Sequence, residues 1–331
     1  MKIVAFFNNK GGVGKTTLVY HLASIFADRG LRTLVVDLDP QANVTSMCLE
    51  EERLEVVWPD KAEHEDTIYG VLRPIIRGIG DIADPHVEPV RERLGLIIGD
   101  LALSTFEDKL SDAWPRCHNR DESAFRTMTA FYRTTCRAAE DFGADLVLVD
   151  VGPNLGAINR AALIASDYVV IPLGPDLFSL QGLRNLGPSL SSWRLSWQEL
   201  IAKSPDPGLP LPGGEMEPIG YVVMQHGMRE NRPPKAYQRW INRFPAAYRR
   251  DVLKEDDTVE VPAVADDPNC LATLKHYRSL MPMAMEARKP VFFLRPADGA
   301  IGAHVEAVRA AYQDFHQLAR RIGERCGLIV G

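Results

Sequence analysis

A glycine-rich segment near the amino terminus, residues 8–17, constrains the fold of this chain more than any other feature. The apolar run Ile3–Phe7 precedes it and indicates a buried parallel strand. Leu18 to Arg29 follow with apolar residues at helical spacing, and Gly30 supplies a helix stop. The sequence therefore predicts a strand, a glycine loop and a helix in succession, which is how a phosphate-binding loop is placed.

The residue types in this loop suit a phosphate chain. Gly11, Gly12 and Gly14 carry no Cβ, so the backbone can curl closely around an anion. Backbone N–H groups at the helix start then point at the phosphates, and the helix dipole favours negative charge there. Lys15 can reach the terminal phosphates, and the Thr16 hydroxyl can bind Mg²⁺. The alternative is a glycine turn without a ligand, which the flanking strand and helix disfavour.

Two residues depart from the usual G-x-x-x-x-G-K-[ST] pattern. Asn9 replaces the first glycine, and asparagine tolerates the positive φ that a glycine there would adopt. Lys10 adds a second lysine to the loop. From Lys10 to Thr17 the segment resembles the deviant Walker A motif of the ParA/MinD/Soj family, K-G-G-V-G-K-T-T, at every position.

This resemblance implies an ATP site, and it implies that Lys10 reaches across a nucleotide-bridged homodimer to the ATP of the partner. The nucleotide-binding residues expected from the motif are Lys10, Gly11, Gly12, Val13, Gly14, Lys15, Thr16 and Thr17.

Acidic residues follow two further apolar runs. Leu31–Val36 leads into Asp37-Leu38-Asp39-Pro40-Gln41-Ala42-Asn43, which resembles the D-x-D-P-Q-G-N motif of the family. The resemblance implies that Asp39 positions the attacking water, with alanine at position 42 in place of glycine. A solvated turn after a strand is the alternative interpretation.

A strand at residues 145–150 ends in Asp150, a Walker B pattern in which the carboxylate holds Mg²⁺ through a water. The loop after it has Gly152 where relatives have proline, and we expect this to increase its flexibility.

The rest of the chain fits the same plan. Leu94–Ile98, Asp167–Pro172 and Pro218–Met224 predict strands, and residues 104–142 predict helices that stop at Gly143. Residues 67–72 and 178–183 resemble family helix starts, the second at the dimer face. Ala287–Phe292 resembles a family strand that closes the nucleotide pocket, which makes Pro290 a nucleotide-site residue. Gln225 and His226, after a strand, are the candidates for contact with the base. Surface insertions are expected near residues 50–66, 204–217 and 227–260.

The most basic stretch lies between residues 229 and 250, with Tyr237, Trp240 and Tyr248 interleaved. It fits the phosphate backbone of DNA, and equally a solvated helical face whose long side chains cover apolar surface. Its cations are Arg229, Arg232, Lys235, Arg239, Arg243, Arg249 and Arg250.

Composition narrows the class of protein. The net charge of −6 over 331 residues gives no general attraction to nucleic acid or anionic lipid, so such binding needs a local patch. Five scattered cysteines without a C-x-x-C pair indicate reduced thiols. With no apolar run of about 18 residues and no signal peptide before the first strand, we expect a cytoplasmic protein.

We therefore expect one P-loop ATPase domain over residues 1–331, with a doubly wound, mostly parallel sheet and helices on both faces. The resemblance implies a homodimerising Mg-ATPase of the ParA type, whose slow hydrolysis is stimulated by a ParB-like adaptor protein. It would partition DNA or other cargo through ATP-dependent, non-specific DNA binding at the nucleoid. No helix-turn-helix extension precedes the loop, so binding to a specific operator is not indicated.

Three alternatives stay open. A MinD-like membrane switch would use the helix predicted over Ala303–Glu324, but its mixed charges favour packing against the core. A metabolic P-loop enzyme, such as an iron–sulfur protein, would need ligand cysteines, and Cys117 and Cys136 lie in helical sequence. A protein scaffold with incidental hydrolysis is the third.

Overall fold

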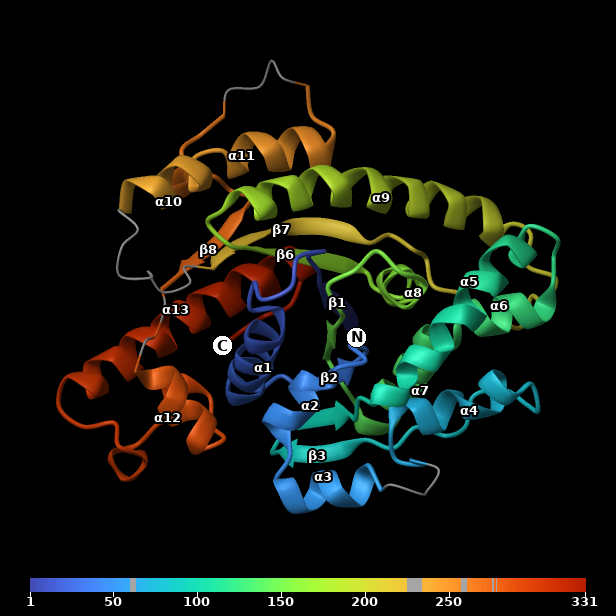
Figure 1. The fold of residues 1–331 in the computed structure, drawn as a ribbon, viewed down its shortest axis with the longest axis horizontal. Coiled ribbons are helices and arrows are strands. Elements are labelled where there is room, and N and C mark those ends of the chain that lie inside the picture. Colours follow the sequence, from blue (N-terminus) through green and yellow to red (C-terminus); the bar gives the residue numbers. More distant parts are fainter. Residues whose placement is uncertain (60–63, 225–233, 257–260, 276, 278) are drawn as a thin grey trace.

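The computed structural model describes residues 1–59, 64–224, 234–256, 261–275, 277 and 279–331, with no side-chain description for 234–236. Its described residues form a sheet of eight strands in the order β3-β4-β2-β5-β1-β6-β7-β8 (Figure 1). All neighbouring strands run parallel except β3 and β4. The strands are β1 (Lys2–Phe6), β2 (Thr33–Asp37), β3 (Glu88–Arg91), β4 (Leu94–Ile97), β5 (Leu146–Asp150), β6 (Tyr168–Leu173), β7 (Glu217–Met224) and β8 (Cys270–Leu274).

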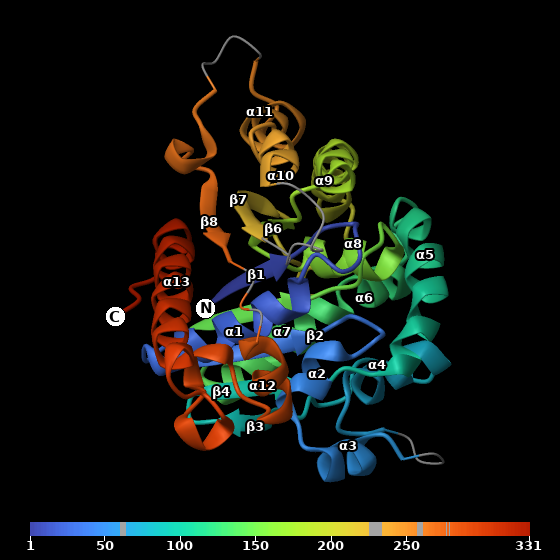
Figure 2. The same cartoon turned by 60° about the vertical axis from the view of Figure 1, so that its left-hand side comes forward.

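Helices cover both faces of this sheet (Figures 1 and 2). They are α1 (Lys15–Asp28), α2 (Asn43–Cys48), α3 (Glu51–Val57), α4 (Ile68–Arg77), α5 (Phe106–Cys117), α6 (Glu122–Met128), α7 (Ala130–Phe142), α8 (Ala157–Ile164), α9 (Leu177–Ile201), α10 (Pro234–Ile241), α11 (Phe244–Ala247), α12 (Leu280–Glu286) and α13 (Ala303–Cys326). Short 3₁₀ helices span Leu101–Thr105, Val264–Asp266, Val291–Phe293 and Pro296–Asp298, and a π-helical turn spans Tyr248–Leu253.

Alternating strand residues divide the interior into two cores. In β1, Val4 and Phe6 pack with α1 and α13, whereas Ile3 and Ala5 pack on the opposite face with α5 to α9. This period of two, in strands buried on both faces, is why the apolar runs predicted parallel strands. The doubly wound, mostly parallel sheet expected from the sequence is confirmed.

The parallel order brings the chemically important loops to one edge of the sheet. Since β2, β5, β1 and β6 are consecutive neighbours and all parallel, their carboxyl ends lie side by side. In open α/β sheets this edge, next to the point where the strand order reverses, is where ligands bind.

The prediction of a strand at Ala287–Phe292 is wrong. Residues Val291–Phe293 form a 3₁₀ turn, closed by the hydrogen bond from the Phe293 N–H to the Pro290 carbonyl. The Val291 N–H donates to a histidine side chain, His21, instead of to a neighbouring strand. This segment therefore covers the sheet without extending it.

One other region differs in detail from expectation, and two agree with it. The predicted insertion near residues 50–66 contains α3, whose Val57 is buried against the α1 side of the sheet. The predicted core role of the last helix is confirmed, because α13 buries Phe315, Leu318 and Ile322. Residues 204–216 form neither helix nor strand, as expected.

Candidate functional site

The loop between β1 and α1 has the backbone of an anion cradle. Gly12 (φ 70°) and Gly14 (φ 87°) adopt left-handed conformations that only glycine adopts without strain. Gly14 is the N-cap residue of α1 and offers no side chain to the N–H groups of the first turn. These N–H groups are left for an anion, as the sequence predicts.

Asn9 does not adopt the left-handed conformation that we expected at this position. Asn9 instead packs closely against Gly182 of α9. The approach is so close that an added Cβ on Gly182 would lie 2.9 Å from Asn9 Oδ1 and 3.0 Å from Asn8 Oδ1. The Asn8 amide also donates to the carbonyl of Pro172, at 2.7 Å. The two asparagines thus dock the loop on β6 and α9.

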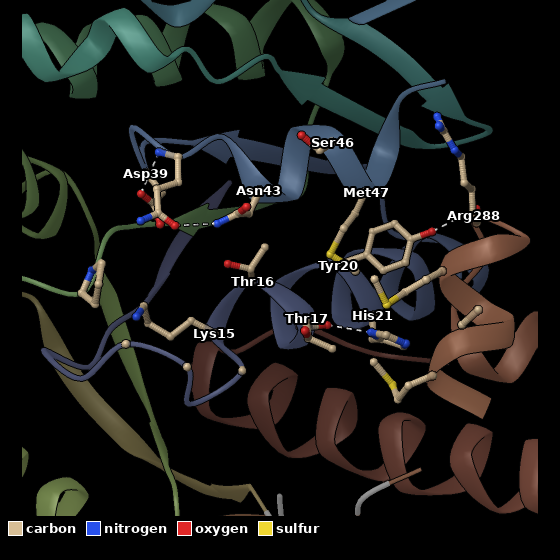
Figure 3. A pocket seen from close by; sticks show the side chains of 18 of the residues that line it. Lys15, Thr16, Thr17, Tyr20, His21, Asp39, Asn43, Ser46, Met47 and Arg288 are labelled. Atoms are coloured by element: carbon tan, nitrogen blue, oxygen red, sulfur yellow. Dashed lines mark hydrogen bonds between the residues drawn. The ribbon is translucent and has the colours of Figure 1, made fainter. Parts of the chain in front are cut away.

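Lys15 is 6% exposed and lies inside the loop, with its Nζ 3.4 Å from the Lys10 carbonyl (Figure 3). Burial lowers the pKa of Lys15, and the negative charges of Asp150 and Asp39 oppose this shift. The ammonium is therefore held near carboxylates without a direct ion pair between described residues, and it is available to phosphate oxygens.

Asp37 and Asp150 are paired in register at the carboxyl ends of β2 and β5, and both are fully buried. Asp37 accepts hydrogen bonds from the hydroxyl (2.7 Å) and the N–H (3.0 Å) of Thr45. Burial raises the pKa of Asp37 to about 7, with a further contribution from Asp39. Asp37 is the first aspartate of the D-x-D motif, for which the sequence predicts no separate role.

Asp150 fits the magnesium site that we expected. Neither of its buried carboxylate oxygens has a hydrogen-bond partner among the described residues. Burial raises the pKa of Asp150 well above its ordinary value, as does the charge of Asp37. A cation is the partner that such a carboxylate lacks. Thr16, in the first turn of α1, is the second magnesium ligand that the sequence predicts, and its side chain lowers the pKa of Asp150 against the effect of burial.

We expect Asp150→Asn to stabilise the ligand-free protein, and more so at higher pH. Because the folded pKa of Asp150 is raised, its contribution to stability is present at low pH and lost as the pH rises. The gain at pH 8 should be about 2 kcal/mol, and it should shrink towards pH 5. Thermal unfolding of both proteins at pH 5 and pH 8, without magnesium, measures this difference. An equal melting temperature at pH 8 would contradict the assignment of an unpaired buried charge.

Asp39, the residue expected to orient water, is 6% exposed and lines the cavity beside the phosphate loop. Its Oδ1 accepts from the Gln41 N–H at 3.0 Å, which orients the carboxylate. Ala42 closes this turn with a left-handed backbone (φ 50°, ψ 37°), at the position where the family motif has glycine. A Cβ carries a strain cost there that glycine does not have.

Ala42→Gly should therefore raise the free energy of unfolding by about 0.5–1 kcal/mol, because relief of the left-handed strain exceeds the added entropy of glycine. Urea unfolding measures the change. Ala310→Gly, in the middle of α13, is the matched control and should lower stability by about 1 kcal/mol. A loss of stability in both variants would show that the turn carries no strain.

The loop after Asp150 is anchored although Gly152 replaces a proline. The Asn159 side chain donates to the carbonyls of Gly152 (2.8 Å) and Asn154 (2.7 Å). Glu107 of α5 caps α8 by accepting from the N–H groups of Ala157 and Ile158. Neither Asn159 nor Glu107 was predicted, since only the fold brings α5 to this loop.

Lys10 forms an ion pair with Asp176 of its own chain, at the start of α9. Its ammonium also lies 5.8 Å from the ring centre of Phe178, a side chain that is 70% exposed. Lys10 thus points away from the cavity of its own subunit, towards exposed surface.

The loop opens into a cavity of about 820 Å³ (Figure 3). Its opposite wall comes from α12 and the segment after it. Pro290, expected to contact nucleotide, is buried behind this wall, and Arg288 and Lys289 line the cavity. The lining residues are Gly11, Gly12, Gly14, Lys15, Thr16, Thr17, Tyr20, His21, Asp39, Gln41, Asn43, Ser46, Met47, Pro153, Met281, Ala284, Met285, Arg288 and Lys289.

His21 is a buried residue of this cavity that the sequence did not reveal, because it lies within the apolar pattern of α1. Its Nδ1–H donates to the Thr17 carbonyl (2.7 Å), and its Nε2 accepts from the Val291 N–H (3.1 Å). Burial lowers the pKa of His21 to about 4, so the ring is neutral at pH 7. The ring stacks on Phe315 with centres 4.8 Å apart.

The basic stretch is more neutralised than its sequence suggests. Arg249 pairs with Glu255 and Asp267, and Arg250 pairs with Asp251. Arg239 and Arg243 lie over the Trp240 ring, 5.1 and 5.5 Å from its centre, and both are exposed. Gln225, His226, Arg229 and Arg232 lie outside the described residues, as does the side chain of Lys235.

The two cysteines considered for a metal cluster, Cys117 and Cys136, lie in α5 and α7. Burial raises the pKa of both thiols, that of Cys117 to about 12. This disfavours the thiolate form that a metal ligand requires. Within the described part of the chain, no helix is long and apolar enough to cross a membrane.

Comparison with known proteins agrees with this geometry. The AAA_31 family, described as an AAA domain, matches residues 1–200. The sporulation initiation inhibitor protein Soj of Bacillus subtilis is 32% identical over 56% of this chain and 63% of its own length. An uncharacterized protein of Methanocaldococcus jannaschii is 25% identical over 78% of this chain and 87% of its own length. The match thus spans less than two thirds of Soj.

Solved structures share the fold. A crystal structure of a Corynebacterium diphtheriae protein superposes with a TM-score of 0.72 and 24% identity, covering 98% of this chain and 99% of that one. The ATP complex of a Cyanothece McdA variant superposes with a TM-score of 0.63 and 15% identity, covering 99% of this chain and 97% of the other.

Proposed function

Because this chain belongs to the ParA/MinD family of AAA-domain P-loop proteins, we propose that it is a Mg-ATP-dependent dimerising switch that hydrolyses ATP slowly. One observation carries this proposal. An anion cradle with Lys15 inside it faces Asp150, whose buried oxygens have no hydrogen-bond partner among the described residues. This arrangement suits a phosphate chain together with a divalent cation.

In this proposal each residue has a defined task. The loop N–H groups and Lys15 bind the phosphate chain, and Thr16 and Asp150 hold Mg²⁺. When bound, the cation neutralises charge on the phosphate oxygens. The Asp39 carboxylate, fixed by the Gln41 N–H, accepts a hydrogen bond from water and orients it for attack.

Dimerisation would use Lys10. Its ion pair with Asp176 holds it at the surface in the single chain. We propose that a second subunit, closing face to face, exchanges this pair for contact with the phosphates of the partner. Hydrolysis would then reopen the dimer, so that ATP and ADP states hold different partners.

DNA is the surface that we propose for the ATP-bound dimer, as the resemblance to ParA-like proteins implies, and an adaptor protein of the ParB kind would stimulate hydrolysis. Arg239 and Arg243 beside Trp240 supply exposed cations with an aromatic ring between them. Such binding would place the protein at the nucleoid. Among the described residues Arg249 and Arg250 are already paired with carboxylates, so we expect affinity to depend on two copies acting together.

Binding to a non-specific DNA duplex tests this proposal. The Asp39→Ala protein would be compared with ATP, ADP and no nucleotide at two salt concentrations. We expect binding with ATP only, weakened by salt. Charge reversal at Arg239 and Arg243 should abolish it, whereas reversal of Arg137 on α7 should not. An ATP-dependent dimer that binds no DNA would overturn the DNA assignment and leave the switch intact.

A further inference from the structure

The segment Arg288–Val291 begins in the far wall of the cavity, which Arg288 and Lys289 line, and continues behind that wall without pairing to a described strand. It leaves α12 through Arg288, whose backbone is left-handed (φ 47°), and it enters a 3₁₀ turn at Val291. A non-glycine residue in that conformation persists only where surrounding contacts hold it. The contacts that hold this segment are therefore informative.

Two consecutive residues of α1 hold the two ends of this segment. The Tyr20 hydroxyl donates to the Arg288 carbonyl at 3.2 Å, and His21 Nε2 accepts from the Val291 N–H at 3.1 Å (Figure 3 shows Tyr20, His21 and Arg288). Both side chains are buried, with 3% and 1% exposed. The neighbouring rings fix them further, since His21 stacks on Phe315 and meets Phe292 edge-on.

The same histidine reaches the phosphate loop. Its Nδ1–H donates to the carbonyl of Thr17, a lining residue that follows Lys15 and Thr16 directly. A chain of contacts therefore runs from the phosphate side, through Thr17 and His21, to Val291 behind the opposite wall. No described residue on any strand replaces this link, because Val291 makes no strand pairing.

We propose that Tyr20 and His21 are positioning residues that set the far wall against the phosphate loop, and that they thereby control binding of the nucleoside part of the ligand. This rests on the proposed nucleotide site. The phosphates would depend on the loop and Lys15, whereas the base and sugar would depend on a wall that this pair holds in place. Loss of Tyr20 and His21 should weaken the binding of nucleotides. It should leave unchanged the binding of a ligand that consists of phosphate groups only.

The test uses Tyr20→Phe and His21→Phe, which keep an aromatic ring at each position and remove the hydrogen bonds to the segment, and in His21→Phe also the bond to the Thr17 carbonyl. Calorimetry with magnesium would measure the affinity for ADP and for inorganic pyrophosphate. We expect ADP affinity to fall about 10-fold in Tyr20→Phe and about 30-fold in His21→Phe, as buried groups lose their partners. Pyrophosphate affinity should stay within about 2-fold of the original. His21→Gln, which retains an acceptor, should recover part of the loss.

Tyr312→Phe is the matched control. It also loses a hydroxyl near α1, one that donates to Asp28 at 2.8 Å, but it lines no part of the cavity. Its ADP affinity should be unchanged. If the His21→Phe protein does not fold, the ADP and pyrophosphate affinities of Tyr20→Phe alone test the positioning role.

The outcomes separate two failures. If the unsubstituted protein binds neither ADP nor pyrophosphate, the assignment of the nucleotide site itself is refuted. If it binds both, unchanged ADP affinity in the variants would overturn the positioning role. Equal losses of ADP and pyrophosphate would also overturn it, because the pair would then be acting on the whole fold.

Discussion

Lys15→Ala is expected to weaken ATP binding at least about 100-fold, the largest loss of affinity expected for any single substitution proposed here. Lys15 Nζ lies inside the loop, beside the Lys10 carbonyl; burial lowers its pKa, and the negative charges of Asp150 and Asp39 oppose this shift. Alanine removes the only loop cation directed at the cavity among the described residues. Calorimetry with Mg-ATP measures the loss.

Lys10→Ala is the informative comparison for this experiment. Lys10 pairs with Asp176 and does not line the cavity, so its loss should leave ATP binding by the single chain unchanged. The same variant should nevertheless fail to dimerise or hydrolyse ATP. Unchanged ATP affinity in Lys15→Ala would refute the phosphate site, and lost affinity in Lys10→Ala would refute the division of roles between the two lysines.

Asp39→Ala is expected to lower ATP hydrolysis about 100-fold or more while ATP binding persists. The carboxylate is oriented by the Gln41 N–H and lies at the cavity wall, where water has access. Its removal takes away the group that orients water and leaves the cradle intact. Release of phosphate over time, at saturating Mg-ATP, measures the change.

Asp108→Ala, at an exposed position of α5, is the control and should hydrolyse ATP at the original rate. Normal turnover by Asp39→Ala would remove this residue from the mechanism. Slow turnover combined with lost binding would instead assign Asp39 to the nucleotide contacts.

The sequence predicted the central strands and the phosphate loop because both depend on local patterns. Strands such as Leu146–Asp150 are apolar on both faces, and glycine is required at positions with positive φ such as Gly12 and Gly14. The edge strands β3 and β8 were missed. In β3 the sequence Glu88–Arg91 is short and polar and contains a proline, which gives no apolar pattern.

The contacts that complete the site could not be predicted, because they join residues far apart in sequence. His21 and Val291 are 270 residues apart, and Glu107 and Ala157 are 50 apart. The pattern of α1 marks Tyr20 and His21 only as positions within a helix. The prediction of a strand at Ala287–Phe292 was wrong for the same reason. The Val291 N–H, which a strand would direct to a neighbouring strand, donates to the His21 side chain of α1.

Sedimentation velocity of the Asp39→Ala protein, with Mg-ATP and with Mg-ADP, tests the proposed switch most directly. We predict a dimer with ATP, a monomer with ADP, and a monomer in both states once Lys10→Ala is added. A protein that stays monomeric with saturating ATP, or that dimerises equally with ADP, would contradict the account.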